Sequence, residues 1–459
     1  MRETPLERAA FTKAAARLLP LLFACYIVAF LDRVNVGFAK LQMAESLHLS
    51  DAAYGFGAGI FFIGYFFFEV PSNLILERVG ARAWIARIMI TWAIVSGAFA
   101  FVAEIPWGPL PSWFGVPPIE FSYYALRFLL GVAEAGFFPG IILYLTYWFP
   151  SARRARTVAL FMTAIVVANV VGAPLSGAIM QYADGMAGWA GWRWLFIIEA
   201  APSLIAGSAV YLLLPDGPKS AKWLSAAERD AIVARLAVDE ARTVDAHARR
   251  NAHSALAAFA NIHVWALAMV YLAIAFALYA VNFWMPTIIQ EMGIARTEYL
   301  KIGLLSMIPW GLAGAAMLAN SAHSDRTGER RWHVATALLV AAFGLLLLAI
   351  VGNAPVPSMI ALSLVTIGVL SAVSTFWSIP TALLRQSAAA AGIAWINSVG
   401  NLGGHFGPDL IGRVRDATGS SSSAFLLLAF FTMLGAVVLL FATRRQPARS
   451  FDRLQRPAV

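Results

Sequence analysis

The stretch NLILERVGAR at residues 73–82 returns in related form as SAHSDRTGER at residues 321–330. An acidic residue, an arginine, a glycine and a second arginine occupy the same offsets in both copies: Glu77, Arg78, Gly80 and Arg82 in the first, and Asp325, Arg326, Gly328 and Arg330 in the second. Each copy is a short polar break between long apolar runs. A motif repeated in this way indicates a chain made of two related halves.

The apolar runs around these motifs are long enough to cross a membrane. The chain has 459 residues, of which 60% are hydrophobic and 13% are charged, and its mean hydropathy is +0.71. Soluble domains are about 45–50% apolar and about 25% charged, so most of this chain must lie in lipid. A helix needs about 20 apolar residues to cross the hydrocarbon layer. This length predicts twelve spans, near residues 17–39, 52–76, 83–104, 118–148, 155–182, 191–214, 260–290, 299–321, 332–352, 356–384, 390–414 and 423–443.

These spans predict an all-α integral membrane protein whose twelve transmembrane helices form two pseudo-symmetric six-helix bundles. We expect an N-terminal bundle at residues 1–214, a cytoplasmic linker at 215–258, a C-terminal bundle at 259–446 and a cytoplasmic tail at 447–459. Kinked helices are expected around Pro139 and Pro380, because proline removes a helical hydrogen bond. The spacing of Ile232 and Leu236 predicts a short surface helix inside the linker.

Positive charge is divided unequally between the two sides of the predicted bundle. Most of the 34 lysines and arginines precede the first span, follow an even-numbered span or close the chain. Cytoplasmic loops carry such an excess, so both termini are expected in the cytoplasm of a bacterial-type inner membrane. No small-residue cleavage site follows the basic N-terminus, which we interpret as part of a retained first helix. The opposite side holds only Lys40, Arg193, Arg296, Lys301, Arg413 and Arg415.

Several further motifs give a resemblance to a known family. They are LDRVNVGFA at residues 31–39, VPSNL at 70–74, GAR at 80–82, RFLLGVAEAGFFPG at 127–140, GWRWLF at 191–196 and NSVGNLG at 397–403. Together with the repeated loop, this set resembles the major facilitator superfamily, and within it the anion:cation symporter family. The chain departs from the general superfamily loop at Asn73, where glycine is usual, and at Glu77, where aspartate is usual.

Charged residues inside the predicted spans indicate a transport site, because a charge at the bilayer centre costs at least a few kcal/mol and persists mainly where it has a function. Arg127 and Glu134 are seven residues apart and so share one helical face, which predicts a pair of opposite charges facing one cavity. Arginine can hold a carboxylate through two parallel hydrogen bonds, and a buried carboxylate can exchange a proton. The other charged residues inside the spans are Asp32, Arg33, Glu69 and Glu199.

The resemblance implies a role for each of these positions. Asp32 and Glu134 are expected to accept protons, Arg33 and Arg127 to bind the anion or couple it to the proton, and Tyr65 to contact the substrate through its hydroxyl. A purely structural ion pair is the alternative for Asp32 with Arg33 and for Arg127 with Glu134. Glu69 and Glu199 are interpreted as packing, gating or structural polar residues.

The second half of the sequence carries almost no charge inside its spans, so we expect it to recognise the rest of the substrate by hydrogen bonding and stacking. Asn397, Asn401 and His405 recur at four-residue intervals, which predicts a polar stripe on one helical face. His405 is interpreted as a hydrogen-bonding residue rather than a proton carrier. The expected substrate contacts from this half are Tyr279, Asn282, Trp377, Asn397 and Asn401.

These observations favour a secondary transporter over other classes of membrane protein. The sequence contains no HExxH, GxxxxGK[ST] or GxSxG motif, so neither a metalloenzyme, an ATP-driven pump nor a serine hydrolase is indicated. The basic residues do not cluster on one surface, and the net charge of +9 therefore does not indicate nucleic-acid binding.

We expect import of a small organic anion by proton symport, with tartrate-like hydroxycarboxylates favoured over sugar acids and aromatic carboxylates. A carboxylate uniporter, exchanger or exporter is the alternative. No cofactor or metal is expected, and one chain should suffice for function. The loop residues Glu77, Arg78, Arg82, Asp325 and Arg326 are expected to act as a gate that latches the two halves together in the outward-open state.

Overall fold

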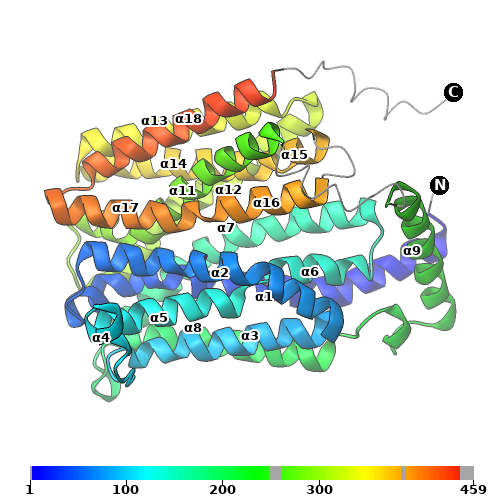
Figure 1. Cartoon of the computed structure of the whole chain (residues 1–459), viewed down its shortest axis with the longest axis horizontal. Helices are drawn as coiled ribbons and strands as arrows, with labels where there is room; N and C mark the ends of the chain where they lie inside the picture. The colour runs from blue at the N-terminus through cyan, green and yellow to red at the C-terminus, as the bar shows by residue number, and fades with distance from the viewer. Residues whose placement is uncertain (1–2, 248–260, 384–388, 445–459) are drawn as a thin grey trace.

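The computed structural model describes residues 3–247, 261–383 and 389–444, and these residues are almost entirely helical (Figure 1). The first part of the chain contains α1 (Pro5–Ser46), α2 (Asp51–Val79), α3 (Ala81–Ala98), α4 (Leu110–Phe114), α5 (Pro118–Glu134), α6 (Phe137–Thr146), α7 (Ser151–Tyr182) and α8 (Gly191–Leu213). After α9 (Ala226–His247), the second part contains α11 (Ile262–Glu291), α12 (Tyr299–Thr327), α13 (Arg331–Val351), α14 (Pro355–Phe376), α15 (Ser378–Leu383), α16 (Ala389–Asn401), α17 (Gly403–Thr418) and α18 (Ser422–Ala442).

The predicted all-helical membrane fold is confirmed. Within the described residues, 11 helices or consecutive helix pairs are long and apolar enough to cross a membrane. The predicted span at residues 390–414 is instead divided into α16 and α17, which are separated at Leu402 and run end to end in Figure 1. Each of these two helices alone is short for a membrane crossing, but as consecutive segments they complete the pattern of twelve.

The kinks expected around Pro139 and Pro380 are both present, as breaks between helices. α5 ends at Glu134 and α6 begins at Phe137, and between them Gly136 has a φ of 85°. This left-handed conformation favours glycine, which has no Cβ to clash with the backbone. A Cβ at this position would also collide with the side chain of Ser72 on α2. In the second half, α14 ends at Phe376 and α15 begins at Ser378.

The helices form two groups that face each other along their lengths. We call α1 to α8 the N half and α11 to α18 the C half; they occupy the lower and upper parts of Figure 1. α1 packs against α11, α2 against α17, and α7 against α12, so these pairs form the interface. The helix expected in the linker is α9, whereas residues 248–258 of that linker and the tail at 447–459 lie outside the described residues.

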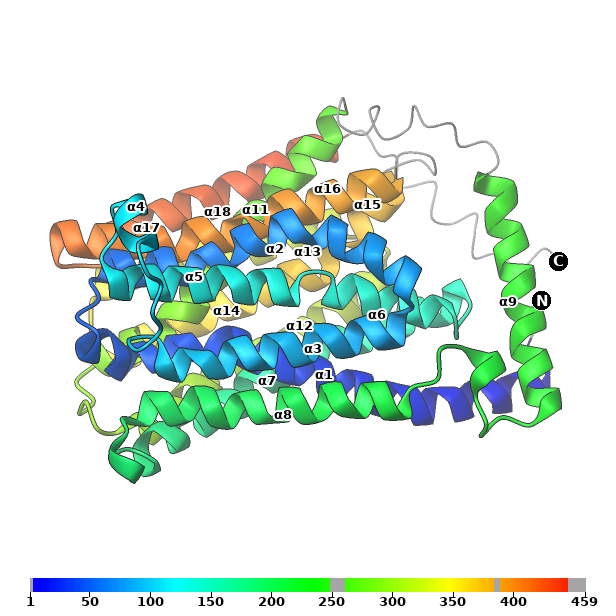
Figure 2. The same ribbon diagram turned by 60° about the horizontal axis from the view of Figure 1, so that its bottom comes forward.

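Two ends of the molecule can be named from the elements that lie there (Figure 2). The α9 end carries α9, α15 and α16, and the α4 end carries α4 and the last turns of α17. Because α16 and α17 follow each other along one line, α16 faces the interface at the α9 end and α17 faces it at the α4 end. The C half therefore presents a different helix to the interface at each end.

Candidate functional site

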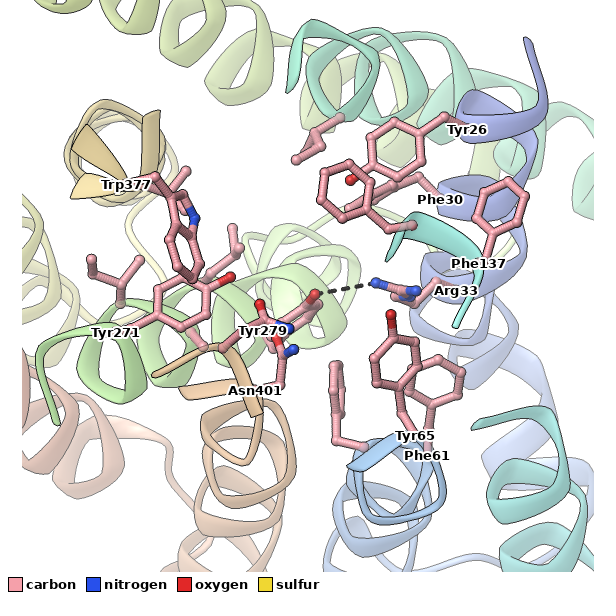
Figure 3. A pocket seen from close by; sticks show the side chains of 18 residues that line it. Tyr26, Phe30, Arg33, Phe61, Tyr65, Phe137, Tyr271, Tyr279, Trp377 and Asn401 are labelled. Carbon is pink, nitrogen blue, oxygen red and sulfur yellow. Dashed lines mark hydrogen bonds between the residues drawn. The ribbon is translucent and has the colours of Figure 1, made fainter. Parts of the chain in front are cut away.

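A cavity of about 110 Å³ lies between the two halves, and most of its wall is aromatic. The N half contributes side chains from α1, α2, α6 and α7, and the C half contributes side chains from α11, α16 and the end of α14. Figure 3 shows the two walls facing each other across the space beside Arg33. The lining residues are Tyr26, Phe30, Arg33, Phe61, Phe62, Tyr65, Phe137, Phe138, Ile165, Tyr271, Ile274, Ala275, Leu278, Tyr279, Val373, Trp377, Asn397 and Asn401.

Arg33 lies at the centre of this site and pairs with Glu134. One guanidinium nitrogen lies 2.6 Å from Glu134 Oε2, and the Glu134 side chain is completely buried. The other terminal nitrogen donates a hydrogen bond of 3.4 Å to the hydroxyl of Tyr279 across the interface. In the described part of the chain, Arg33 Nε and Glu134 Oε1 have no hydrogen-bond partner. A buried arginine–carboxylate pair with unused hydrogen-bonding atoms can exchange one partner for another anion.

Aromatic rings surround the Arg33 guanidinium. Its central carbon lies 5.2 Å from the ring centre of Phe30, 5.1 Å from that of Phe61 and 5.7 Å from that of Tyr65. A cation within about 6 Å of a ring face is attracted by the ring quadrupole. The rings therefore stabilise the positive charge without neutralising it, and they leave it able to pair with an anion.

The predicted pair between Arg127 and Glu134 is not the pair that forms. Both side chains are buried on α5, as their shared face predicted, but Arg127 donates to the carbonyl oxygens of Ala58 at 3.0 Å and Gly57 at 3.4 Å. Glu134 is the last residue of α5, and Arg33 reaches it from α1. Arg127 is not among the cavity-lining residues, so its guanidinium connects α5 to the backbone of α2.

Asp32 points away from Arg33 and from the cavity, into the N half. Its carboxylate accepts hydrogen bonds from Trp92 Nε1 at 3.0 Å, from Ser96 Oγ at 2.8 Å and from the hydroxyl of Ser203. Asp32 and Arg33 are neighbours in sequence, but consecutive residues of a helix face different directions. No ion pair joins Asp32 to Arg33 in the described structure, so the alternative interpretation of a structural pair between these neighbours is not supported.

The residues predicted from the C half divide into those that reach the cavity and those that do not. Tyr279, Trp377, Asn397 and Asn401 line it together with Tyr65 of the N half. Asn282 instead borders a smaller pocket between α1, α7, α11 and α12.

Of the three residues in the predicted polar stripe, Asn397 and Asn401 line the cavity and His405 does not. The helix is interrupted at Leu402, and the His405 ring packs against Phe56 on α2, with ring centres 5.6 Å apart. His405 therefore faces α2, as Asn397 does through Glu69, but it is not among the residues that line the cavity.

Glu69 contacts the opposite half directly. Its carboxylate accepts hydrogen bonds from Asn397 Nδ2 at 3.1 Å and from Ser398 Oγ at 3.4 Å. Glu199, a further acid inside the spans, accepts a hydrogen bond of 2.6 Å from Ser176 inside the N half. Glu69 thus joins α2 to α16 across the interface, next to the cavity.

The loop residues of the repeated motif make ion pairs within their own surroundings. Arg82 lies 3.1 Å from Asp216, and Asp325 lies 2.5 Å from Arg330, four residues after Arg326. Neither pair joins the N half to the C half. Among the described residues, no ion pair joins Glu77, Arg78 or Arg82 to Asp325 or Arg326 across the interface.

Sequence reasoning missed two tyrosines and the aromatic residues around them. Tyr26 precedes Arg33 by seven residues, and Tyr271 precedes Tyr279 by eight, so each lies on the same helical face as a residue that was identified. Their spacing from Arg33 and Tyr279 is the signal that could have found them. The phenylalanines Phe30, Phe61, Phe62, Phe137 and Phe138 carry no such signal in an apolar sequence.

The family can be assigned by comparison with known proteins. The family model of the Major Facilitator Superfamily matches residues 22–408. The chain belongs to this superfamily. It is therefore a membrane transporter and not an enzyme, and the described residues contain no group of three or more His, Cys, Asp or Glu side chains that could hold a metal ion.

Individual relatives cover nearly the whole chain. A putative tartrate transporter from Agrobacterium vitis is 48% identical over 96% of this chain and 96% of its own length. The putative metabolite transport protein NicT from Pseudomonas putida is 42% identical over 94% of both chains. The inward-open structure of the xylose transporter XylE from E. coli superposes with a TM-score of 0.70 at 14% identity, covering 95% of this chain and 99% of that one. These matches confirm the resemblance to the superfamily and its anion:cation symporter type.

Proposed function

We propose that this transporter imports a small organic carboxylate together with protons across a bacterial inner membrane. The observation that carries the proposal is the Arg33–Glu134 pair, a permanent cation and a titratable acid that are joined at 2.6 Å beside a cavity between the two halves. The names of the Agrobacterium vitis and Pseudomonas putida relatives support an organic acid as the cargo.

The pair supplies a direct link between protons and the anion. While Glu134 is ionised, it occupies Arg33 and competes with the substrate carboxylate for the guanidinium. Protonation of Glu134 removes this competitor, and Arg33 can then form two parallel hydrogen bonds to the substrate. Because each event favours the other, proton affinity and anion affinity rise together, as thermodynamic linkage requires. Asp32 lies on the same helix as Arg33 and accepts hydrogen bonds from Trp92 and Ser96 of α3 and Ser203 of α8; it is the second proposed proton site.

Alternating access follows from relative motion of the two halves around the cavity. The bundles at residues 1–214 and 259–446 are proposed to rock as units, so that the cavity faces one side of the membrane and then the other. Glu77, Arg78 and Arg82 are proposed to meet Asp325 and Arg326 when the α9 end closes. Positive charge in the loops of the α9 end supports placing this end in the cytoplasm.

The decisive experiment is the Glu134→Gln variant in proteoliposomes. Glutamine imitates the protonated acid, so the variant should still bind substrate and exchange it across the membrane. Accumulation driven by a pH gradient should fall at least about tenfold, because no proton is released to reset the carrier. Glu120→Gln, near the other end of the same helix, is the matched control because Glu120 contacts only Tyr124 among the described side-chain hydrogen bonds.

Three outcomes separate the possible mechanisms. Retained exchange with lost accumulation supports coupling through Glu134. Normal accumulation by the variant would overturn the role of Glu134 and leave Asp32 to be tested in the same way. If the unaltered protein takes up a carboxylate without any proton movement, it is a uniporter or an exchanger.

A further inference from the structure

We infer that the substrate carries a single carboxylate on a flat aromatic ring, rather than two carboxylates on a hydroxylated chain. This inference rests on the proposed function and narrows the substrate class of the same cavity. The name of the Agrobacterium vitis relative points to tartrate for that protein, whereas the lining of this cavity favours a different chemistry.

The charge of the site is sufficient for one carboxylate. Among the described residues that line the cavity, Arg33 is the only lysine or arginine. Arg127, the other arginine inside the membrane nearby, is buried with 1% exposure and already donates to two backbone carbonyl groups on α2. A second substrate carboxylate would therefore lie in the cavity without a cation, and burial of an unpaired charge is strongly unfavourable.

The walls on both sides of Arg33 are suited to a ring. From the N half, Tyr26 stacks on Phe138 with ring centres 5.3 Å apart and planes inclined by 26°. From the C half, Tyr271 meets Trp377 with ring centres 4.7 Å apart. Figure 3 shows Tyr26 on one side, and Tyr271 and Trp377 on the other side, of the space that the Arg33 guanidinium enters. An aromatic substrate placed there gains edge or face contacts as well as burial of its apolar surface.

The polar groups of the cavity are few and partly occupied. The hydroxyl of Tyr279 accepts a hydrogen bond from Arg33, and the amide of Asn397 donates to Glu69. Asn401 and the remaining tyrosine hydroxyls are left to contact polar substituents. Phenylalanine and aliphatic side chains outnumber these groups in the lining, so a sugar acid would place some of its many hydroxyl groups where they have no partner, which is costly.

A panel of five carboxylates tests the inference on the intact transporter in detergent and in proteoliposomes. Benzoate is the aromatic monocarboxylate, cyclohexanecarboxylate has the same charge without the aromatic ring, and phthalate adds a second carboxylate to the ring. Tartrate and gluconate represent the hydroxylated alternatives. We expect benzoate to bind about fivefold more tightly than cyclohexanecarboxylate through ring contacts, and at least about tenfold more tightly than phthalate, tartrate and gluconate.

A variant series connects this preference to the cavity. Trp377→Leu should reduce the ratio of benzoate to cyclohexanecarboxylate affinity, and Trp113→Leu, on the exposed helix α4, should leave it unchanged. A ratio of two affinities is insensitive to the fraction of protein that folds. An unchanged ratio in Trp377→Leu would remove the C-half wall from ring recognition and overturn the inference.

The inference and the proposed function fail in different ways. If tartrate or gluconate binds as tightly as benzoate and drives proton-coupled uptake, the ring preference is wrong while the proposed function stands. If none of the five carboxylates binds or moves protons, both the proposed function and the inference are wrong.

Discussion

The two ends of the interface between the halves are held together in different ways. At the α4 end, Arg415 of α17 lies 2.8 Å from Asp51 of α2 and 2.6 Å from Glu291 of α11. At the α9 end, the contact we find beside the cavity is made by Glu69 with the neutral side chains of Asn397 and Ser398. An ion pair in which both groups are charged is stronger than a hydrogen bond from a neutral donor to a carboxylate, so we expect the α4 end to be held more firmly than the α9 end.

A helix cap and two close backbone contacts also distinguish the α4 end from the α9 end. The Asp416 carboxylate accepts hydrogen bonds from the backbone nitrogens of Asp51 at 3.0 Å and Ala52 at 2.9 Å, and so caps the first turn of α2 from the opposite half. A Cβ at Gly55 would collide with the carbonyl oxygen of Pro408, and a Cβ at Gly412 would collide with that of Asp51. Glycine allows the backbones of two membrane helices to approach closely, and this contact closes the α4 end.

The largest expected effect comes from separating these backbones. Gly55→Leu places a bulky side chain against Pro408 on α17, so the α4 end should no longer close and transport should fall at least about tenfold. Access to the cavity is measured with a second substitution, Asn401→Cys, in a protein from which the buried Cys25 has been removed. The rate at which this cysteine reacts with an impermeant maleimide reports whether the cavity is open. We expect labelling from the α4 side to increase.

The control for this variant is Gly311→Leu, because a Cβ at Gly311 meets no atom within 4 Å. It changes a glycine of a spanning helix to the same side chain and should leave both transport and labelling unchanged. Normal transport by Gly55→Leu would contradict the idea that close helix approach closes this end.

A smaller effect is expected from the charges alone. Arg415→Leu leaves Asp51 with Lys40, 2.7 Å away, and leaves Glu291 without this arginine. Loss of charge-assisted hydrogen bonds of this kind costs about 1.5–3 kcal/mol, which corresponds to about a tenfold or larger shift toward opening of the α4 end. The same maleimide assay measures the shift.

Arg413→Leu is the matched control for Arg415→Leu. Its side chain is 62% exposed and pairs with Asp409 on the same helix, so its loss does not separate the halves. Equal labelling of the two variants would show that the cross-interface position of Arg415 is unimportant.

The smallest effect is expected at the α9 end. Glu69→Gln keeps the shape of the side chain, but Asn397 and Ser398 donate to different oxygens of Glu69, and an amide group retains only one oxygen as an acceptor. The loss is at most one hydrogen bond, the longer one at 3.4 Å from Ser398, or about 1 kcal/mol, and labelling from the α9 side should rise only a few-fold. A shift as large as that of Arg415→Leu would mean that the two ends are held equally firmly.

Much of the fold followed from the sequence because lipid imposes simple rules on it. Apolar length alone located the spans, and Pro139 and Pro380 marked the two helix breaks. The site was harder to predict, because Arg127 and Glu134 were placed correctly on one face but not with the correct partners. Which guanidinium reaches Glu134 depends on the packing of α1 against α5, and helical periodicity within one segment contains no information about a neighbouring helix.

The location of His405 outside the cavity was hidden in the same way. Its ring packs against Phe56 of α2 instead of lining the cavity, and the spacing of Asn397, Asn401 and His405 gives no information about where along the stripe the cavity ends. The aromatic wall was also invisible because 13% of the chain is Phe, Trp or Tyr, and these residues serve packing throughout a membrane protein. Only the three-dimensional arrangement distinguishes the rings that face the cavity from those that face lipid.

The linker helix has a consequence for biosynthesis. Trp223 stacks on Trp148 with ring centres 5.5 Å apart, Arg17 lies over Trp223, and Lys13 pairs with Glu228 of α9 at 2.8 Å. All of these partners precede α11 in the chain, and amino-terminal units generally fold first during synthesis. The ribosome has therefore supplied every residue of this cluster before the second set of membrane helices emerges, so the first half can be completed while the rest of the protein is still being made.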